Sequence, residues 1–127
     1  MNEKFYLGTY TKRDSKGLYS VTLNKETEQL ESLTLEATID NPTYLSYSKS
    51  DQLLFAVGKG EEHCGISASN ALTSPVEPLA SYDDQKAVPC YIRYNEKTGD
   101  VLTANYHGGF VELYHYDKAA KTFTSID

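Results

Sequence analysis

Strict alternation of apolar and polar residues identifies one stretch of this chain as a half-buried β-strand. In residues 33–39, leucine, alanine and isoleucine alternate with threonine and glutamate without a break. A repeat of two places the apolar side chains on one face of a strand and the polar ones on the other. No segment keeps helical periodicity over about ten residues or more, so the pattern predicts an all-β protein.

The other apolar stretches also fit strands, and clusters of turn residues separate them. Residues 53–57 form an unbroken apolar run, which is typical of a strand covered on both faces. Residues 76–82 follow Pro75 and contain Pro78, and proline favours the edge of a sheet. The remaining predicted strands are residues 5–10, 18–23, 41–48, 65–69, 88–95, 101–105 and a strand that begins at Phe110.

The chain repeats itself at a spacing of 46 to 48 residues. The segment NPTYL at residues 41–45 matches VPCYI at residues 88–92. Two further sets of segments occupy equivalent positions in the repeat. The first set is residues 6–8, 54–56 and 102–104, and the second is the turns that begin at residues 24, 70 and 117. A four-stranded unit of about 40–50 residues is the signature of a β-propeller blade. The repeat therefore predicts one propeller domain with blades at residues 1–40, 41–87 and 88–127.

These blades are predicted to form an incomplete propeller. The first unit lacks its opening strand, because Phe5 already lies in the register of a second strand. Closed propellers have about four to eight blades, so three cannot close. We interpret the chain as the N-terminal part of a longer propeller, or as a piece that associates with other chains through its open blade edges. A self-contained β-sandwich of about eleven strands is the alternative.

The stretch from Ala104 to Val111 contains adjacent glycines between two predicted strands, which indicates a tight hairpin turn with positive φ values. It places the amide of Asn105 and the imidazole of His107 at one end of the third blade. In a four-stranded meander, the turn between the middle strands and the link to the next blade lie on the same face. That face should also hold Arg13, Lys59 and Asn41, and we expect a ligand there.

Composition excludes several classes of partner and cofactor. The formal net charge is −6 and the only arginines are Arg13 and Arg93, so the chain lacks the basic stripes that bind nucleic acid. No apolar run approaches the length of a membrane span, and no signal peptide is recognised. Cys64 and Cys90 lack metal-site spacing, and the neighbours His63 and Cys64 do not make a site. We expect a cytoplasmic protein without metal or cofactor.

The ordered set of motifs resembles the lactonase family of seven-bladed β-propellers, whose best-known activity is that of a 6-phosphogluconolactonase. The matching segments are YLGTYT at residues 6–11, GLY at 17–19, NPTYL at 41–45, LLFAV at 53–57 and ANYHGG at 104–109. The resemblance implies a lactone hydrolase of sugar-phosphate metabolism, of which this chain would be about a third. It also implies that further catalytic residues, a histidine motif and later arginine and glutamate positions, follow Asp127.

A phosphorylated sugar lactone requires donors for the phosphate, a base for water and donors for the developing oxyanion. Asn105 and Asn41 can donate amide hydrogens, and the His107 imidazole can act as a base or contact the phosphate. Lys59 and Arg13 are the candidate cations, and Glu61 and Glu62 are the candidate carboxylates. No serine or cysteine has a triad setting, so a covalent acyl-enzyme is not indicated.

Each of these assignments has a structural alternative. Asn105 can instead satisfy backbone groups at a strand end, and His107 can be an idle residue of an exposed turn. The tyrosines that recur in register, Tyr44, Tyr47, Tyr91 and Tyr94, fit packing between blades. The rival function is a non-catalytic propeller that binds a protein or a carbohydrate. For the isolated chain we expect little or no catalysis.

Overall fold

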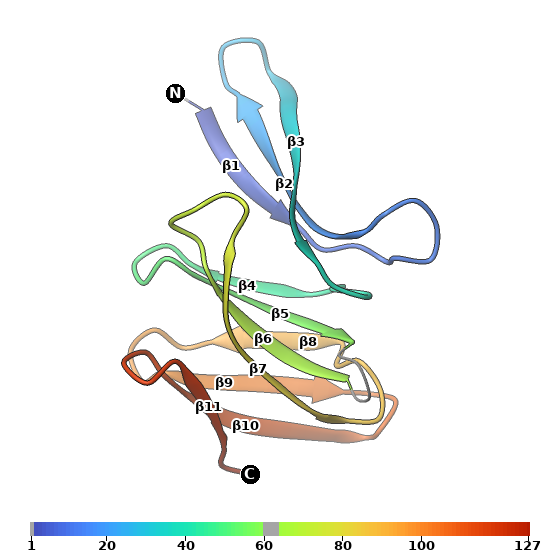
Figure 1. The fold of residues 1–127 in the computed structure, drawn as a ribbon, viewed down its shortest axis with the longest axis vertical. Coiled ribbons are helices and arrows are strands. Elements are labelled where there is room, and N and C mark those ends of the chain that lie inside the picture. The colour runs from blue at the N-terminus through green and yellow to red at the C-terminus, as the bar shows by residue number, and fades with distance from the viewer. Residues whose placement is uncertain (1, 60–63) are drawn as a thin grey trace.

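The computed structural model describes residues 2–59 and 64–127, and these residues form eleven β-strands and no helix (Figure 1). No described segment is a helix that could cross a membrane. The strands are β1 (Asn2–Leu7), β2 (Gly17–Asn24), β3 (Gln29–Thr38), β4 (Leu45–Ser48), β5 (Leu53–Lys59), β6 (Cys64–Asn70), β7 (Glu77–Gln85), β8 (Tyr91–Tyr94), β9 (Asp100–Asn105), β10 (Phe110–Asp117) and β11 (Thr122–Ser125).

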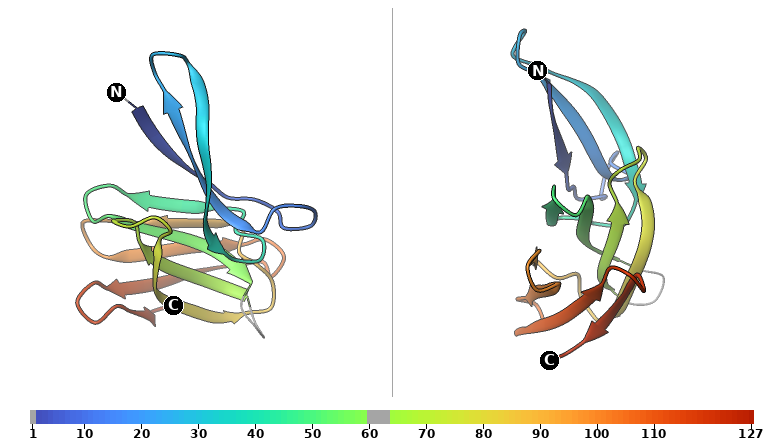
Figure 2. Two further views of the ribbon diagram at one scale, coloured as in Figure 1. Left: turned by 45° about the horizontal axis from the view of Figure 1, so that its top comes forward. Right: turned by 90° about the vertical axis from the view of Figure 1, so that its left-hand side faces the viewer.

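The strands form three antiparallel sheets in the order of the chain, which we call blades 1, 2 and 3. Blade 1 has three strands, β1 to β3, whereas blade 2 (β4 to β7) and blade 3 (β8 to β11) have four each. Blades 2 and 3 lie face to face, and blade 1 leans away from them (Figures 1 and 2). The all-β, incomplete-propeller prediction is therefore confirmed, including the strand missing from blade 1. The sandwich alternative is wrong, because the strands form three separate meanders.

Several predicted strands are shorter than expected or displaced, and backbone hydrogen bonds explain why. The strand expected at residues 5–10 ends at Leu7, since the Thr9 amide instead donates to the Pro42 carbonyl at 3.1 Å. Gly8 allows this approach, because a Cβ there would lie 2.2 Å from the Pro42 oxygen. The strands expected at 41–48 and 88–95 reduce to β4 and β8. Both segments carry a proline before the strand, and proline has no amide hydrogen for a ladder.

Strand β5 is buried on both faces, as its apolar run predicts. Alternate residues of β5 enter two different cores. Leu53, Phe55 and Val57 face blade 3, whereas Leu54 and Ala56 pack toward blade 1. The expectation for residues 76–82 is also confirmed, because β7 is the outer edge of blade 2.

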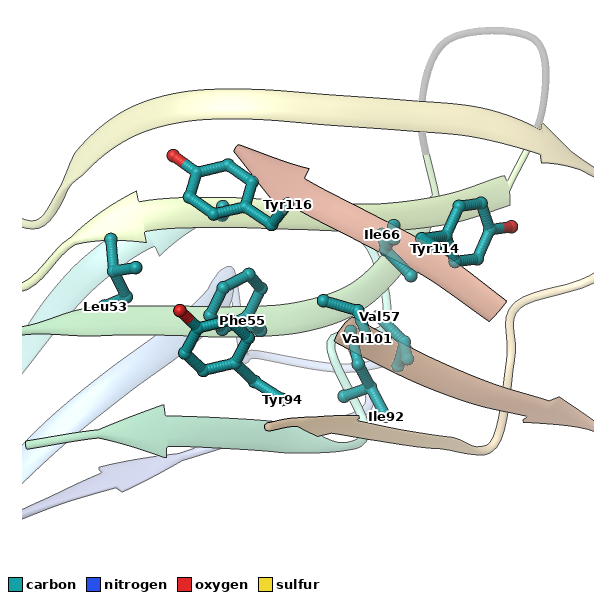
Figure 3. Close-up of a cluster of buried hydrophobic side chains, with 10 residues drawn as sticks. Leu53, Phe55, Val57, Ile66, Ile92, Tyr94, Val101, Tyr114 and Tyr116 are labelled. Atoms are coloured by element: carbon teal, nitrogen blue, oxygen red, sulfur yellow. The ribbon is translucent and has the colours of Figure 1, made fainter. Parts of the chain in front are cut away.

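The core between blades 2 and 3 is built around the ring of Phe55. This ring stacks on Tyr94, with centroids 4.4 Å apart, and meets Tyr116 edge-on at 5.5 Å (Figure 3). Burying one such side chain contributes about 1.5–3 kcal/mol, and aromatic pairing adds about 0.5–1.5 kcal/mol. The packing role predicted for Tyr94 is confirmed, since its side chain is buried against blade 2.

The interface between blades 1 and 2 has a smaller apolar cluster than the one between blades 2 and 3, and it contains a buried carboxylate. Glu36 on β3 accepts hydrogen bonds from the hydroxyls of Ser20 at 2.7 Å and Ser74 at 2.8 Å. Its Oε2 also lies 3.4 Å from the Lys4 ammonium, while Oε1 is without a hydrogen-bond partner among the described residues. Burial raises the pKa of Glu36, but the two hydroxyl donors and Lys4 outweigh burial and leave that pKa below its ordinary 4.5.

Replacing Glu36 by glutamine tests this contact between blades. We expect Glu36→Gln to lower the free energy of unfolding near neutral pH by about 1–3 kcal/mol, because its donors lose a charged acceptor. A carboxylate whose pKa is lowered in the folded state stabilises the fold at pH values above its ordinary pKa. This stabilisation is lost as the pH falls through the lowered pKa. In urea titrations, the difference from wild type should therefore shrink in acid.

The matched control is Glu31→Gln, an exposed position on the same strand, which should unfold like the wild type. A difference for Glu36→Gln that stays constant from neutral pH into acid would contradict this account of the carboxylate.

The open surfaces of the blades make a second prediction. Strand β1 pairs with β2 on one side only, and blade 3 exposes apolar side chains, including Leu102, Phe110 and Val111. Unpaired edges and exposed apolar faces favour association between chains. We expect the 127-residue chain made alone to form oligomers or aggregates in size-exclusion chromatography with light scattering. A sharp monomer peak would count against open blade surfaces in solution.

Candidate functional site

A cleft of about 400 Å³ opens where four connecting segments meet on one side of the blades. The loop between β1 and β2, the links that precede β4 and β8, and the turn between β9 and β10 lie on this side (Figure 1). The cleft is lined by Tyr10, Lys12, Asn41, Thr43, Ala87, Val88, Pro89, Cys90, Tyr106 and His107. The structure therefore brings Asn41 and His107 together, as the blade geometry predicts. Pockets of this size are within the range of small-ligand sites.

Asn41 is held rigidly between blades 1 and 2. Its Oδ1 accepts hydrogen bonds from the Thr11 amide at 2.9 Å and from the Thr11 hydroxyl at 3.2 Å. The Asn41 amide in turn donates to the Thr11 hydroxyl at 3.1 Å, and its φ of 51° is one that asparagine tolerates. Among the described residues, Nδ2 has no hydrogen-bond partner. The side chain is thus fixed through its oxygen, and its NH2 group is available to a ligand.

Asn105 has a different role from the one expected, because both hydrogens of its amide are already engaged. Nδ2 donates to Gln85 Oε1 at 2.7 Å and to the Ala87 carbonyl at 2.9 Å. Its Oδ1 accepts from the Gly108 amide at 3.1 Å, and the residue is only 2% exposed. The contacts match the structural alternative, in which Asn105 satisfies groups at the strand end. It orients the turn that carries His107.

The turn between β9 and β10 is longer than the tight glycine turn that was expected. Four residues, 106–109, connect the strands, and the Gly109 amide donates to the Asn105 carbonyl at 2.9 Å. Gly109 alone of the two glycines has a positive φ, at 72°. The His107 ring lies on the Tyr106 ring, with centroids 4.1 Å apart, and the imidazole is exposed. An imidazole in this position can exchange protons with water or with a ligand in the cleft.

A buried polar network behind the cleft escaped the sequence analysis. Gln85 lies at the end of β7, and its Nε2 donates to the Tyr114 hydroxyl at 3.1 Å. That hydroxyl also contacts Asp84 at 3.1 Å and Glu112. Burial, followed by the hydrogen bond to Glu112, raises the pKa of Tyr114 far above its ordinary value, so the phenol stays protonated. Because the predicted strand stopped at Tyr82, nothing in the periodicity marked Gln85 as buried.

The structure does not bring the expected cations into this cleft. Lys59 ends β5 and lines a separate cleft with Ile39 and Ser81, and Arg13 is exposed in the β1–β2 loop. The cation that lines the cleft is Lys12, whose ammonium lies 5.5 Å from the centre of the Tyr10 ring. Adjacent positions in a loop cannot be ranked from sequence, because no regular period fixes which one points inward.

Two further expectations concern carboxylates and metals. Glu61 and Glu62, together with His63, lie outside the described residues. Within residues 2–59 and 64–127, no cluster of three or more histidine, cysteine or acidic side chains is placed to hold a metal ion.

Gln85→Leu tests whether the network positions the His107 turn. The variant leaves Asn105 Nδ2 and the Tyr114 hydroxyl each without one partner, which should cost about 1–3 kcal/mol in the free energy of unfolding. We also expect faster hydrogen exchange of the Gly108 amide, because its acceptor Asn105 loses an anchor. Gln29→Leu, at an exposed position at the start of β3, is the control. Unchanged exchange at Gly108 in the Gln85 variant would contradict the positioning role.

Comparisons with known proteins agree with the fold. The family model described as "Lactonase, 7-bladed beta-propeller" matches residues 4–126. A 6-phosphogluconolactonase of Bacillus subtilis (strain 168) is 34% identical over 115 residues, which are 86% of this chain and 32% of that protein. An uncharacterized protein of Lactococcus lactis subsp. cremoris (strain MG1363) is 37% identical over 114 residues, which are 90% of this chain and 33% of that protein.

Solved structures give the same result. A protein from Lactobacillus plantarum superposes with a TM-score of 0.88 at 31% identity, over 100% of this chain and 37% of the other. A putative 6-phosphogluconolactonase from Bacteroides uniformis gives a TM-score of 0.78 at 29% identity, over 94% of this chain and 35% of the other. The chain spans about a third of the length of the curated relatives it matches. With three meander blades and a family match over nearly all its residues, the chain belongs to the lactonase family of seven-bladed β-propellers.

Proposed function

We propose that this chain is part of a lactone hydrolase that acts on 6-phosphogluconolactone. The observation that carries the proposal is the cleft in which a cation, an amide donor and an imidazole meet: Lys12, Asn41 and His107. These are three of the groups that hydrolysis of a phosphorylated lactone requires. The activity named for the Bacillus subtilis relative supports the same substrate.

The three side chains have distinct roles in the proposed reaction. The Lys12 ammonium binds the phosphate of the substrate as a point charge. His107 accepts a proton from a water molecule as the water oxygen attacks the lactone carbonyl, and Nδ2 of Asn41 donates to the oxyanion that develops there. The tetrahedral intermediate then breaks its bond to the ring oxygen, which takes the proton back from His107. The product is the open-chain hydroxy acid.

Water is the nucleophile in this proposal, and no serine or cysteine forms a covalent intermediate. Cys90 lines the cleft, but its thiol is directed to the Ala104 carbonyl at 3.4 Å. Both cysteines are free, and a cytoplasmic setting, where thiols stay reduced, is part of the proposal.

The decisive assay compares hydrolysis of 6-phosphogluconolactone by the product of the complete reading frame with the spontaneous rate. We expect clear acceleration, and a decrease of about 10²–10⁴-fold in kcat for His107→Asn, since a general base contributes about that much. His115→Asn is the control, because His115 lies on β10 beside Asp100, at 3.5 Å, and away from the cleft. The 127-residue chain alone should give little or no rate above background.

Two results would overturn parts of the proposal. A rate for the complete product equal to spontaneous hydrolysis would favour the rival function, a propeller that binds a protein or a carbohydrate without turnover. Equal rates for wild type and His107→Asn would assign the base to another residue.

A further inference from the structure

Adjacent residues of the β1–β2 loop serve the two binding tasks of the proposed hydrolysis. Lys12, the proposed phosphate ligand, directly follows Thr11 in the chain. Thr11 in turn holds Asn41, the proposed donor to the oxyanion, across the joint between blades 1 and 2. Recognition of the phosphate and stabilisation of the oxyanion therefore meet in one contact between the loop and the link before β4.

Three hydrogen bonds join Thr11 to Asn41, and we call them the Thr11–Asn41 clamp. The Thr11 amide and hydroxyl both donate to Asn41 Oδ1, at 2.9 Å and 3.2 Å. The Asn41 amide donates back to the Thr11 hydroxyl at 3.1 Å. The Thr9 amide donates to the Pro42 carbonyl at 3.1 Å, so residues 9–11 and 41–42 lie along each other.

The clamp determines where the NH2 group of Asn41 points. A carboxamide is planar, so the directions of its two N–H bonds are set once its oxygen is held. Both donors to Oδ1 belong to Thr11, and no other described residue donates to this oxygen. A displacement of Thr11 would therefore turn Nδ2 relative to the lactone carbonyl. Hydrogen bonds to a developing oxyanion weaken steeply when they are misaligned.

The loop that carries Thr11 is held weakly on the side of the cleft. It spans residues 8–16, whereas the turn between β9 and β10 spans only residues 106–109. At the base of the loop, the Thr9 hydroxyl donates to the Gly17 carbonyl at 2.6 Å. Lys12 is exposed, and the partner of its ammonium among the described residues is the Tyr10 ring, 5.5 Å away at its centre. A cation–π contact at an exposed site is weak, so Lys12 can turn toward an anion.

An anion at Lys12 meets no opposing charge in the cleft. Of the described residues that line the cleft, none is acidic, and the bases among them are Lys12 and His107. A phosphate bound by Lys12 forms a charge-assisted hydrogen bond, which is stronger than one between neutral groups. Because Thr11 and Lys12 are neighbours in the backbone, a phosphate that holds Lys12 also restricts Thr11.

We propose that the Thr11–Asn41 clamp couples phosphate binding to oxyanion stabilisation, so that the phosphate of the substrate raises kcat and does not only tighten binding. This proposal rests on the proposed function, and Thr11 is a positioning residue in it, because Thr11 acts through Asn41. Binding energy from a remote part of a substrate raises kcat when it orders groups at the reacting centre. The preferred substrates are lactones whose phosphate and carbonyl reach Lys12 and Asn41 at the same time.

Kinetics of the product of the complete reading frame on two substrates test the coupling. 6-Phosphogluconolactone is compared with glucono-δ-lactone, which keeps the ring and lacks the phosphate, and both rates are corrected for spontaneous hydrolysis. We expect the wild-type kcat to be about tenfold higher for the phosphorylated lactone, since truncated substrates lose kcat in this situation. Thr11→Val removes the hydroxyl and keeps the shape, and it should make the two kcat values nearly equal. Thr11→Ser keeps the hydroxyl and should preserve most of the difference.

Further variants separate the clamp from a general structural effect. Lys12→Gln should also make the two kcat values nearly equal, but it should raise KM for the phosphorylated lactone, which Thr11→Val should leave nearly unchanged. The double variant should lower kcat by less than the product of the two single effects, because both changes break the same coupling. Thr22→Val is the matched control, at a half-buried threonine of β2 that does not line the cleft, and it should behave like the wild type.

Hydrogen exchange of the complete product gives a reading that does not depend on turnover. Inorganic phosphate, compared with chloride at the same ionic strength, should slow exchange of the Thr11 and Asn41 amides, which are both donors in the clamp. Lys12→Gln should abolish this protection. Thr11→Val should speed exchange of the Asn41 amide, which loses its acceptor, and should make it insensitive to phosphate.

The outcomes distinguish the coupling from the hydrolysis on which it rests. Equal wild-type kcat values for the two lactones, with only KM changed by the phosphate, would overturn the coupling and leave the hydrolysis standing. Rates equal to spontaneous hydrolysis for both lactones would overturn the proposed function, and the effect on kcat with it. Phosphate that protects the Thr11 amide but not the Asn41 amide would overturn the coupling whatever the rates are.

Discussion

The burial of β5 on both of its faces is the constraint on which the rest of this structure depends. One set of its side chains, centred on Phe55, meets the aromatic residues of blade 3, and the alternate set meets blade 1. The part of β5 that is buried on both faces must therefore be apolar at consecutive positions, as it is from Leu53 to Val57, and a polar side chain there would be buried in one of the two cores. Because β5 belongs to both interfaces, it sets the spacing of the three blades.

The two interfaces that share β5 differ in their physics. Between blades 2 and 3, large rings pack against one another, with Phe55 stacked on Tyr94. Between blades 1 and 2, the apolar cluster is small, and Glu36 is buried with hydroxyl donors from both blades. Aromatic packing is insensitive to pH, whereas a buried carboxylate depends on its ionisation. Figure 2 shows the corresponding geometry: blades 2 and 3 are stacked closely and blade 1 is inclined to them.

The candidate site follows from this arrangement of blades. Packing of the blades brings the ends of β5 and β9 and the links before β4 and β8 to one side. The cleft forms there, and its lining residues come from different blades. Asn41 and Asn105 show how an asparagine can serve such a site in two ways. Asn41 is fixed through its oxygen and leaves its NH2 group available, whereas Asn105 uses every polar atom to hold the turn that carries His107.

The sequence by itself determined the strand content, the repeat, the missing strand of blade 1 and the side of the blades on which Asn41 and His107 meet. Period-two patterning and turn residues depend on interactions between near neighbours in the chain. Because the same pattern recurs in each repeat, these features could be predicted from the sequence. Only the tertiary structure decided that Lys12 rather than Arg13 lines the cleft and that both amide hydrogens of Asn105 are engaged. It alone placed Gln85 behind the His107 turn. These outcomes depend on contacts between residues far apart in the chain, for which local periodicity carries no information.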